Sequence, residues 1–230
     1  MSEAIKSEVA QQGLQALMRV WFDFERQLGR IPLLQRLQRG QFSLDDYQKL
    51  LLHWRQQVIE GSRWISRCAS SFDREYSDVR SAIIGHARDE HRDYEMLEQD
   101  FVAAGGQLAA IHAATRAANI GSEALHGFIM YRASQPNPVD LVGAMWIIEG
   151  LGQKMASSWA GQIEQATGCD SNCTRFMRYH GSQDEHHMQE LYQLLDRVCS
   201  TPEQLAAIVR TAKVVARLYC LQLEEVEHGQ

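Results

Sequence analysis

The amino-acid sequence predicts an all-α protein, a bundle of seven or eight helices that forms one domain over residues 1–230. Apolar residues recur at helical spacing along most of the chain, as at Leu14, Leu17, Met18 and Trp21. No segment alternates apolar and polar residues with the two-residue period of a half-buried strand, and Asn-Gly and Asp-Gly hairpin turns are absent. Capping signals at the starts of several segments complete the helical pattern.

Capping and helix-ending residues fix the expected boundaries of these helices. Capping boxes at Ser43–Asp46 and Thr201–Gln204 each start a helix, because the two side chains of such a box satisfy free backbone N–H groups. Asn137-Pro138 is a further helix start, and Gly105-Gly106 supplies the left-handed residue that commonly ends a helix. The expected helices are 4–29, 43–70, 77–104, 107–118, 122–134, 138–167, 172–199 and 202–227.

Composition and charge exclude several classes of protein. Hydrophobic residues make up 45% and charged residues 23% of the chain, as in a folded globular protein. The net charge is −6 and no lysine or arginine cluster is present, so nucleic acid is not an expected partner. The longest apolar run, Leu141–Ile148, is far shorter than the roughly 20 residues that span a bilayer, so no membrane contact is expected. Five cysteines without a C-x-x-C pair, and the absence of a secretory signal, indicate a cytoplasmic protein.

The strongest chemical signal lies in the expected helix 172–199. His180, Asp184 and His187 stand at i, i+4 and i+7, which puts two imidazoles and one carboxylate on a single helix face. Nitrogen and oxygen ligands of this kind suit iron, manganese or zinc. The alternative is a solvated polar face, since several other polar residues crowd the same segment.

A second helix repeats this spacing. His86, Glu90 and Asp93 also stand at i, i+4 and i+7, within the expected helix 77–104. Two such triplets on long helices could face each other in the core of a bundle, where helical di-metal proteins place their carboxylate and histidine ligands.

Glu149 lies in the most apolar helix of the chain, directly after Met145–Ile148. A carboxylate buried there needs a cation or hydrogen-bond donors, so Glu149 is a third candidate metal ligand. Gly150 and Gly152 lower the helix propensity beside it, and we expect them to leave room for a ligand or for a close neighbour. The alternative is a glutamate on an exposed stripe or one paired with an arginine.

These residues resemble a known fold. The segment Trp146–Gly152, the signature His180-x3-Asp184-x2-His187 and the order of the helices are similar to the heme-oxygenase-like fold, in its TenA-like and diiron-oxidase branches, from about residue 14 to residue 200. The resemblance implies a non-heme diiron or iron–manganese oxidase or oxygenase that activates dioxygen against a small organic substrate such as an amino acid or a fatty acid. It carries over Glu149, His180, Asp184 and His187 as metal ligands, and it implies two metal ions per chain and a homodimer.

The helix 77–104 departs from the family pattern. The diiron oxidases place a histidine one or two turns after the glutamate of this helix, whereas Asp93 and Leu97 stand at the corresponding positions after Glu90. In one arrangement His86 and Asp93 are the two ligands, with the histidine before the carboxylate instead of after it. In the other, Glu90 binds the metal and His86 only contacts a ligand without binding the metal itself. The candidates rank in this order: His180, Asp184 and His187, then Glu149, Glu90 and His86, and last Asp93 and Glu60.

Other functions fit the sequence less well. Heme oxygenases take an axial histidine from the first helix, and residues 1–52 contain none. TenA-type thiamine hydrolysis uses a cysteine nucleophile, and the cysteines of the long helices lack that family's local context. A ferritin-type site would need Glu123-x2-His126 and Glu225-x2-His228, the second almost at the end of the sequence. The alternative from a different class is a metal-free, TenA-like helical protein that binds a small molecule in its bundle cavity.

Overall fold

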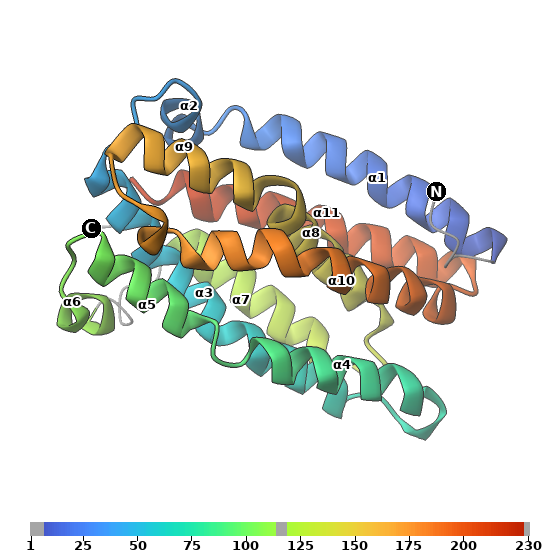
Figure 1. The fold of residues 1–230 in the computed structure, drawn as a ribbon. Helices are drawn as coiled ribbons and strands as arrows, with labels where there is room; N and C mark the ends of the chain where they lie inside the picture. Colours follow the sequence, from blue (N-terminus) through green and yellow to red (C-terminus); the bar gives the residue numbers. More distant parts are fainter. Residues whose placement is uncertain (1–6, 114–118, 228–230) are drawn as a thin grey trace.

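The computed structural model describes residues 7–113 and 119–227. Helices make up most of these two ranges and lie along one another in a bundle (Figure 1), and neither range contains a strand. Within them, none of the helices combines the length and the apolar character needed to pass through a bilayer. The predicted all-α bundle is confirmed.

The helical segments outnumber the expected seven or eight because long segments are interrupted. The α-helices are α1 (Glu8–Leu28), α2 (Pro32–Gln38), α3 (Leu44–Ser70), α4 (Ser77–Glu90), α5 (Tyr94–Ala103), α6 (Leu108–Ala113), α7 (Ile120–Ala133), α8 (Val142–Leu151), α9 (Ser157–Thr167), α10 (Arg175–Val198) and α11 (Pro202–Glu224). Short 3₁₀ turns η1 (Arg74–Tyr76), η3 (Val139–Leu141) and η5 (Ser171–Cys173) precede α4, α8 and α10, and the π-helical segment η4 (Gly152–Ala156) joins α8 to α9.

The helix α11 packs against α1, α7 and α8 and organises the core. It starts at the expected capping box, in which the Gln204 side chain accepts a hydrogen bond from the Thr201 backbone at 3.1 Å. Gly143 of α8 allows a close approach to α11, since a Cβ on Gly143 would lie 2.1 Å from the carbonyl oxygen of Ile208. This contact fixes α8, and with it Glu149, against the core.

The helix α3 also begins as predicted, because both hydrogen bonds of the capping box between Ser43 and Asp46 are present. It packs against α4, α5 and α7. Its neighbours α4 and α5 replace the single predicted helix 77–104. The chain turns at residues 91–93 between them, and the Asp93 backbone N–H donates to the Glu90 carbonyl at 3.2 Å within that turn. The predicted end is confirmed, since Gly105 has a positive φ of 85°.

Several other boundaries differ from the expectation. The predicted Asn137 cap is wrong: Asn137 has a φ of 47°, and its side chain donates to Asp73 at 2.6 Å instead of capping a helix. Pro32 starts the unexpected helix α2, where proline at the first position loses no hydrogen bond. The predicted helices 4–29 and 107–118 include residues that lie outside the described ranges, and their described parts are α1 and α6. The predicted helix 202–227 is α11, which ends three residues earlier, at Glu224.

Candidate metal centre

Two helices bring three of the predicted ligands together. His86 and Glu90 lie one turn apart on α4, and Glu149 reaches them from α8. His86 Nε2 lies 3.4 Å from Glu90 Oε1 and 3.2 Å from Glu149 Oε1. One ligand atom from each residue lies within 4.8 Å of the other two. The exposed fractions of His86 and Glu149 are only 7% and 3%, so this charged group is inside the protein and not on a solvated face.

A second pair of side chains meets where α10 passes the turn after α4. His180 Nε2 of α10 lies 3.2 Å from Asp93 Oδ2, and Asp93 is buried. The ring of Phe176, one turn earlier on α10, packs 4.3 Å from the ring of His180. Gly181 holds this part of α10 close to α9, because a Cβ there would lie 2.1 Å from Ser157 Oγ. The ring of Phe176 and the close approach of α9 at Gly181 therefore fix the position of His180.

The other two predicted ligands of α10, Asp184 and His187, have side chains outside the described residues. The backbone there is described, and it continues α10 as an uninterrupted helix from Arg175 to Val198.

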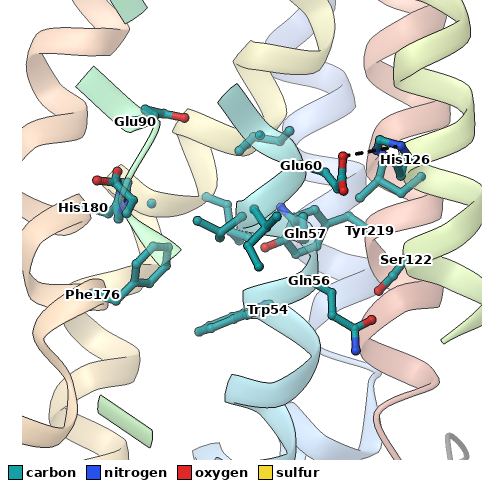
Figure 2. A pocket seen from close by; sticks show the side chains of 18 of the residues that line it. Trp54, Gln56, Gln57, Glu60, Glu90, Ser122, His126, Phe176, His180 and Tyr219 are labelled. Atoms are coloured by element: carbon teal, nitrogen blue, oxygen red, sulfur yellow. Dashed lines mark ion pairs between the residues drawn. The ribbon is translucent and has the colours of Figure 1, made fainter. Parts of the chain in front are cut away.

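Both groups border one cavity of about 250 Å³. Glu90, Asp93, Glu149 and His180 contribute to its wall. Figure 2 shows Glu90 and His180 on one side of α3, and Ser122 and His126 on the other. Much of the remaining wall is apolar and includes Trp54, Trp64, Ile129, Ile148, Trp159 and Phe176. Such a largely apolar cavity with a few convergent polar groups is the usual form of a small-molecule site.

The two glycines after Glu149 have different surroundings. Gly152 lines the cavity, as expected for a residue that leaves room for a ligand. Gly150 does not, because a Cβ on Gly150 would lie 3.1 Å from the ring of Trp21. Of the two expected uses of these glycines, Gly152 therefore fits room for a ligand, and Gly150 fits a close neighbour, because its missing side chain accommodates the Trp21 ring of α1.

A model of the family described as iron-containing redox enzymes matches residues 51–220. The chain belongs to this family. The matched range contains every residue of both groups described above. No curated protein sequence matches the chain.

Solved structures show that this member of the family has a heme-oxygenase-like fold. A domain of unknown function with that fold from Shewanella denitrificans OS217 has a TM-score of 0.85 and 16% identity, and the match covers 92% of this chain and 90% of the other. A TenA homolog from Pseudomonas syringae pv. tomato has a TM-score of 0.78 and 13% identity, with 99% and 98% covered. The predicted resemblance to this fold is confirmed.

The donor chemistry of the centre fits the iron that the family name implies. Carboxylate oxygens and imidazole nitrogens are ligands that iron and manganese accept, and thiolates are absent from the described cavity wall. Two carboxylates share the first group with one imidazole, so a bound cation would balance their charge. Burial by itself lowers the pKa of His86, but contact with Glu149 and the charges of Glu90 and Glu149 outweigh it and raise that pKa to about 9.

The structure also changes the relative standing of two residues that ranked last by sequence. Asp93 contacts His180, and its spacing of seven residues from His86 was the one signal for it in the sequence. Figure 2 shows Glu60 of α3 apart from Glu90, and Glu60 Oε2 is 3.7 Å from His126 Nε2 of α7. Ser122 and His126 also line the cavity. No spacing rule connects these two residues to Glu60, because the three come together only through the packing of α3 on α7.

Proposed function

We propose that this protein is a non-heme diiron or iron–manganese oxidase or oxygenase that activates dioxygen against a small organic substrate, such as an amino acid or a fatty acid. The observation that carries the proposal is the buried group of His86, Glu90 and Glu149 beside a cavity. Membership of a family of iron-containing redox enzymes supports the choice of iron. A helical bundle with facing carboxylates and histidines is the arrangement in which di-metal sites are built.

The ligands that we propose come from three parts of the chain. His86, Glu90 and Glu149 are assigned to one metal ion, because their ligand atoms already converge. His180, Asp184 and His187 of α10 are assigned to the second ion. Asp93 joins them because its carboxylate contacts His180.

Iron held by such ligands supplies the electrons that reduce dioxygen. The chain's own residues provide the surroundings. Trp54 and Trp159 stack with ring centroids 6.2 Å apart on the cavity wall, and Phe176 packs on Trp54 from α10. These rings exclude water from the space beside Glu90 and His180 and give an apolar substrate a surface to bind. The carboxylates of Glu90 and Glu149 border the cavity, so they can exchange protons with a molecule bound there.

A metal-free protein that binds a small molecule in the same cavity is the second candidate. The similarity in fold to a TenA homolog favours it, as does the apolar cavity wall. Hydrolysis by a cysteine nucleophile is not supported, because the cysteines of the long helices are fully buried, do not line the described cavity and have thiol pKa values that burial raises. They are Cys68, Cys199 and Cys220. This candidate is therefore a binding protein.

Metal content and oxygen consumption separate the two candidates. The protein is incubated with Fe(II) without air, freed of unbound metal, and then mixed with oxygenated buffer in an oxygen electrode. We expect bound iron and oxygen consumption, both largely lost in Asp184→Ala and His187→Ala. The control is His112→Ala, which removes an exposed histidine of α6 outside the cavity.

Two results would count against the oxidase. Protein that retains no iron favours the metal-free binding protein. Protein that holds iron but consumes no dioxygen, alone or with a panel of amino acids and fatty acids, is a metal-binding bundle without oxidase activity.

A further inference from the structure

A second polar group lies in the cavity, away from the proposed metal ligands. Glu60 of α3 projects toward His126 of α7, and Ser122 lies one turn before His126 (Figure 2). Glu90 and His180 lie on the other side of α3 in the same view. We call Glu60, Ser122 and His126 the distal polar group.

Each member of the distal polar group has a buried atom without a hydrogen-bond partner among the described residues. These atoms are Ser122 Oγ, Glu60 Oε2 and His126 Nδ1. Ser122 is 94% buried, since only 6% of it is exposed, and it lines the cavity. Buried polar atoms are nearly always hydrogen-bonded in folded proteins, so three such atoms around one space indicate that a polar ligand group satisfies them.

The three atoms share one hydrogen-bonding role. Glu60 Oε2 is a carboxylate oxygen and accepts, and a serine hydroxyl oxygen accepts readily. His126 Nε2 faces Glu60 at 3.7 Å, so the tautomer with a proton on Nε2 is favoured and Nδ1 is left as an acceptor. Arg63 binds the other oxygen of Glu60, at 2.8 Å, and holds that side chain in place. The distal polar group therefore suits a donor with several N–H groups.

The charge of the cavity wall points the same way. Its described residues include the carboxylates of Glu60, Glu90, Asp93, Glu123 and Glu149, and they include no lysine or arginine. A free carboxylate at the distal polar group would meet the carboxylates of Glu60 and Glu123, and Arg63, which does not line the cavity, is already paired with Glu60. An ammonium group there would face opposite charge, and it carries three donors for the three acceptors.

We propose that the distal polar group binds the ammonium group of a primary amine substrate. The apolar body of the amine lies along Trp54, Trp64, Leu125, Ile129 and Ile148 and extends toward Glu90 and Glu149. This inference rests on the proposed function for the meaning of "substrate", but the binding it describes does not require the metal. It narrows the substrate class to amines that carry an apolar chain or ring.

Calorimetric titration with three probes of one length tests the proposal: n-hexylamine, hexan-1-ol and hexanoate. The titrations use both iron-loaded protein without air and metal-free protein. We expect n-hexylamine to bind at least tenfold more tightly than either other probe in both forms. Glu60→Gln should weaken n-hexylamine binding by about tenfold or more and leave the iron content unchanged. Ser122→Ala should weaken it several-fold.

The matched control is Asp23→Asn on α1. Asp23 forms the same kind of i,i+3 pair with Arg26 that Glu60 forms with Arg63, but it is exposed and is not part of the cavity wall. We expect this variant to bind n-hexylamine as the parent protein does.

Three outcomes would overturn the proposal. One is hexanoate binding as tightly as n-hexylamine, and another is unchanged amine binding in both Glu60→Gln and Ser122→Ala. The third is a loss of iron in Glu60→Gln, which would make Glu60 a metal ligand. A failure of the proposed oxidase gives a different result, because the protein would then bind n-hexylamine through Glu60 and hold no iron.

Discussion

Two buried carboxylates on neighbouring parts of the chain, Asp140 and Glu149, have very different surroundings. Each is only 3% exposed. Asp140 Oδ2 accepts hydrogen bonds from Arg132 Nε at 2.8 Å and from Thr211 Oγ1 at 2.7 Å, so a guanidinium balances its charge. Glu149 shares His86 with a second carboxylate, Glu90. Acidic groups outnumber the basic one there.

The difference shows how burial can serve stability at one place and ligand binding at another. A buried charge that is paired and hydrogen-bonded, like Asp140, holds its neighbours together, and removing it leaves a partner unpaired. A buried group with excess negative charge lowers the stability of the metal-free protein and gains from a cation. We therefore expect substitutions at Asp140 to change folding and substitutions at Glu149 to change metal binding.

The largest expected effect is the loss of iron from Glu149→Gln. The amide keeps the shape of the side chain but removes the charge of a proposed metal ligand. Loss of a residue that contacts a ligand without binding the metal lowers metal affinity by about 10–100-fold, and we expect a larger loss of iron affinity here. The metal-free variant should melt at the same temperature as the parent or higher, because one buried negative charge is gone. Equilibrium dialysis and calorimetry measure the two quantities.

The reciprocal variant, Asp140→Asn, should unfold more easily and keep its iron. Arg132 and Thr211 lose a charged acceptor, and because the Arg132 side chain is 32% exposed we expect a loss of about 3 kcal/mol in the free energy of unfolding, at the lower end for a buried pair. Urea denaturation gives this value. A variant that is as stable as the parent but binds less iron would reverse the comparison.

An effect of similar size is expected from pH acting on His86 in the metal-free protein. Its pKa is raised from the ordinary 6.5 to about 9, so the protonated imidazole stabilises the folded state. That stabilisation is fully present below pH 6.5 and is lost as the pH rises through 9. We expect the stability difference between the parent and His86→Gln to shrink by about 3 kcal/mol as the pH rises from 6 to 10, because one pKa unit corresponds to about 1.4 kcal/mol. A difference that stays constant from pH 6 to pH 10 would show that no such shift exists.

The smallest expected effect is that of Thr211→Val on α11. It removes one of the two hydrogen bonds to Asp140 and leaves Arg132 in place. The free energy of unfolding should fall by about 1 kcal/mol, with no change in iron binding. A loss as large as that of Asp140→Asn would mean that Thr211, and not Arg132, provides most of the pairing.

Local rules in the sequence were enough for part of this structure. The capping boxes at Ser43 and Thr201 form as predicted, because each depends on residues within one turn of helix. Glu149 is buried as expected from the apolar helix around it. The arginine pairing weighed for Glu149 occurs instead at Asp140, because Arg132 of α7 lies beside η3.

Contacts between distant segments decided the rest. The turn at residues 91–93 follows no helix-ending signal in the sequence, and Asp93 there contacts His180 of α10. Gly150 packs on Trp21 of α1, a contact that no spacing within α8 could indicate. The distal polar group likewise depends on how α3 and α7 lie together. Helix type and capping could be read from the sequence, whereas these contacts needed the fold.

An anaerobic Fe(II) binding titration of the parent protein, Glu149→Gln and Asp140→Asn shows whether the buried group of His86, Glu90 and Glu149 holds iron. We expect two iron ions per chain in the parent and in Asp140→Asn, and about one in Glu149→Gln, because Glu149 is assigned to one of the two ions. Full iron binding by Glu149→Gln, or no stoichiometric binding by the parent, would contradict this assignment.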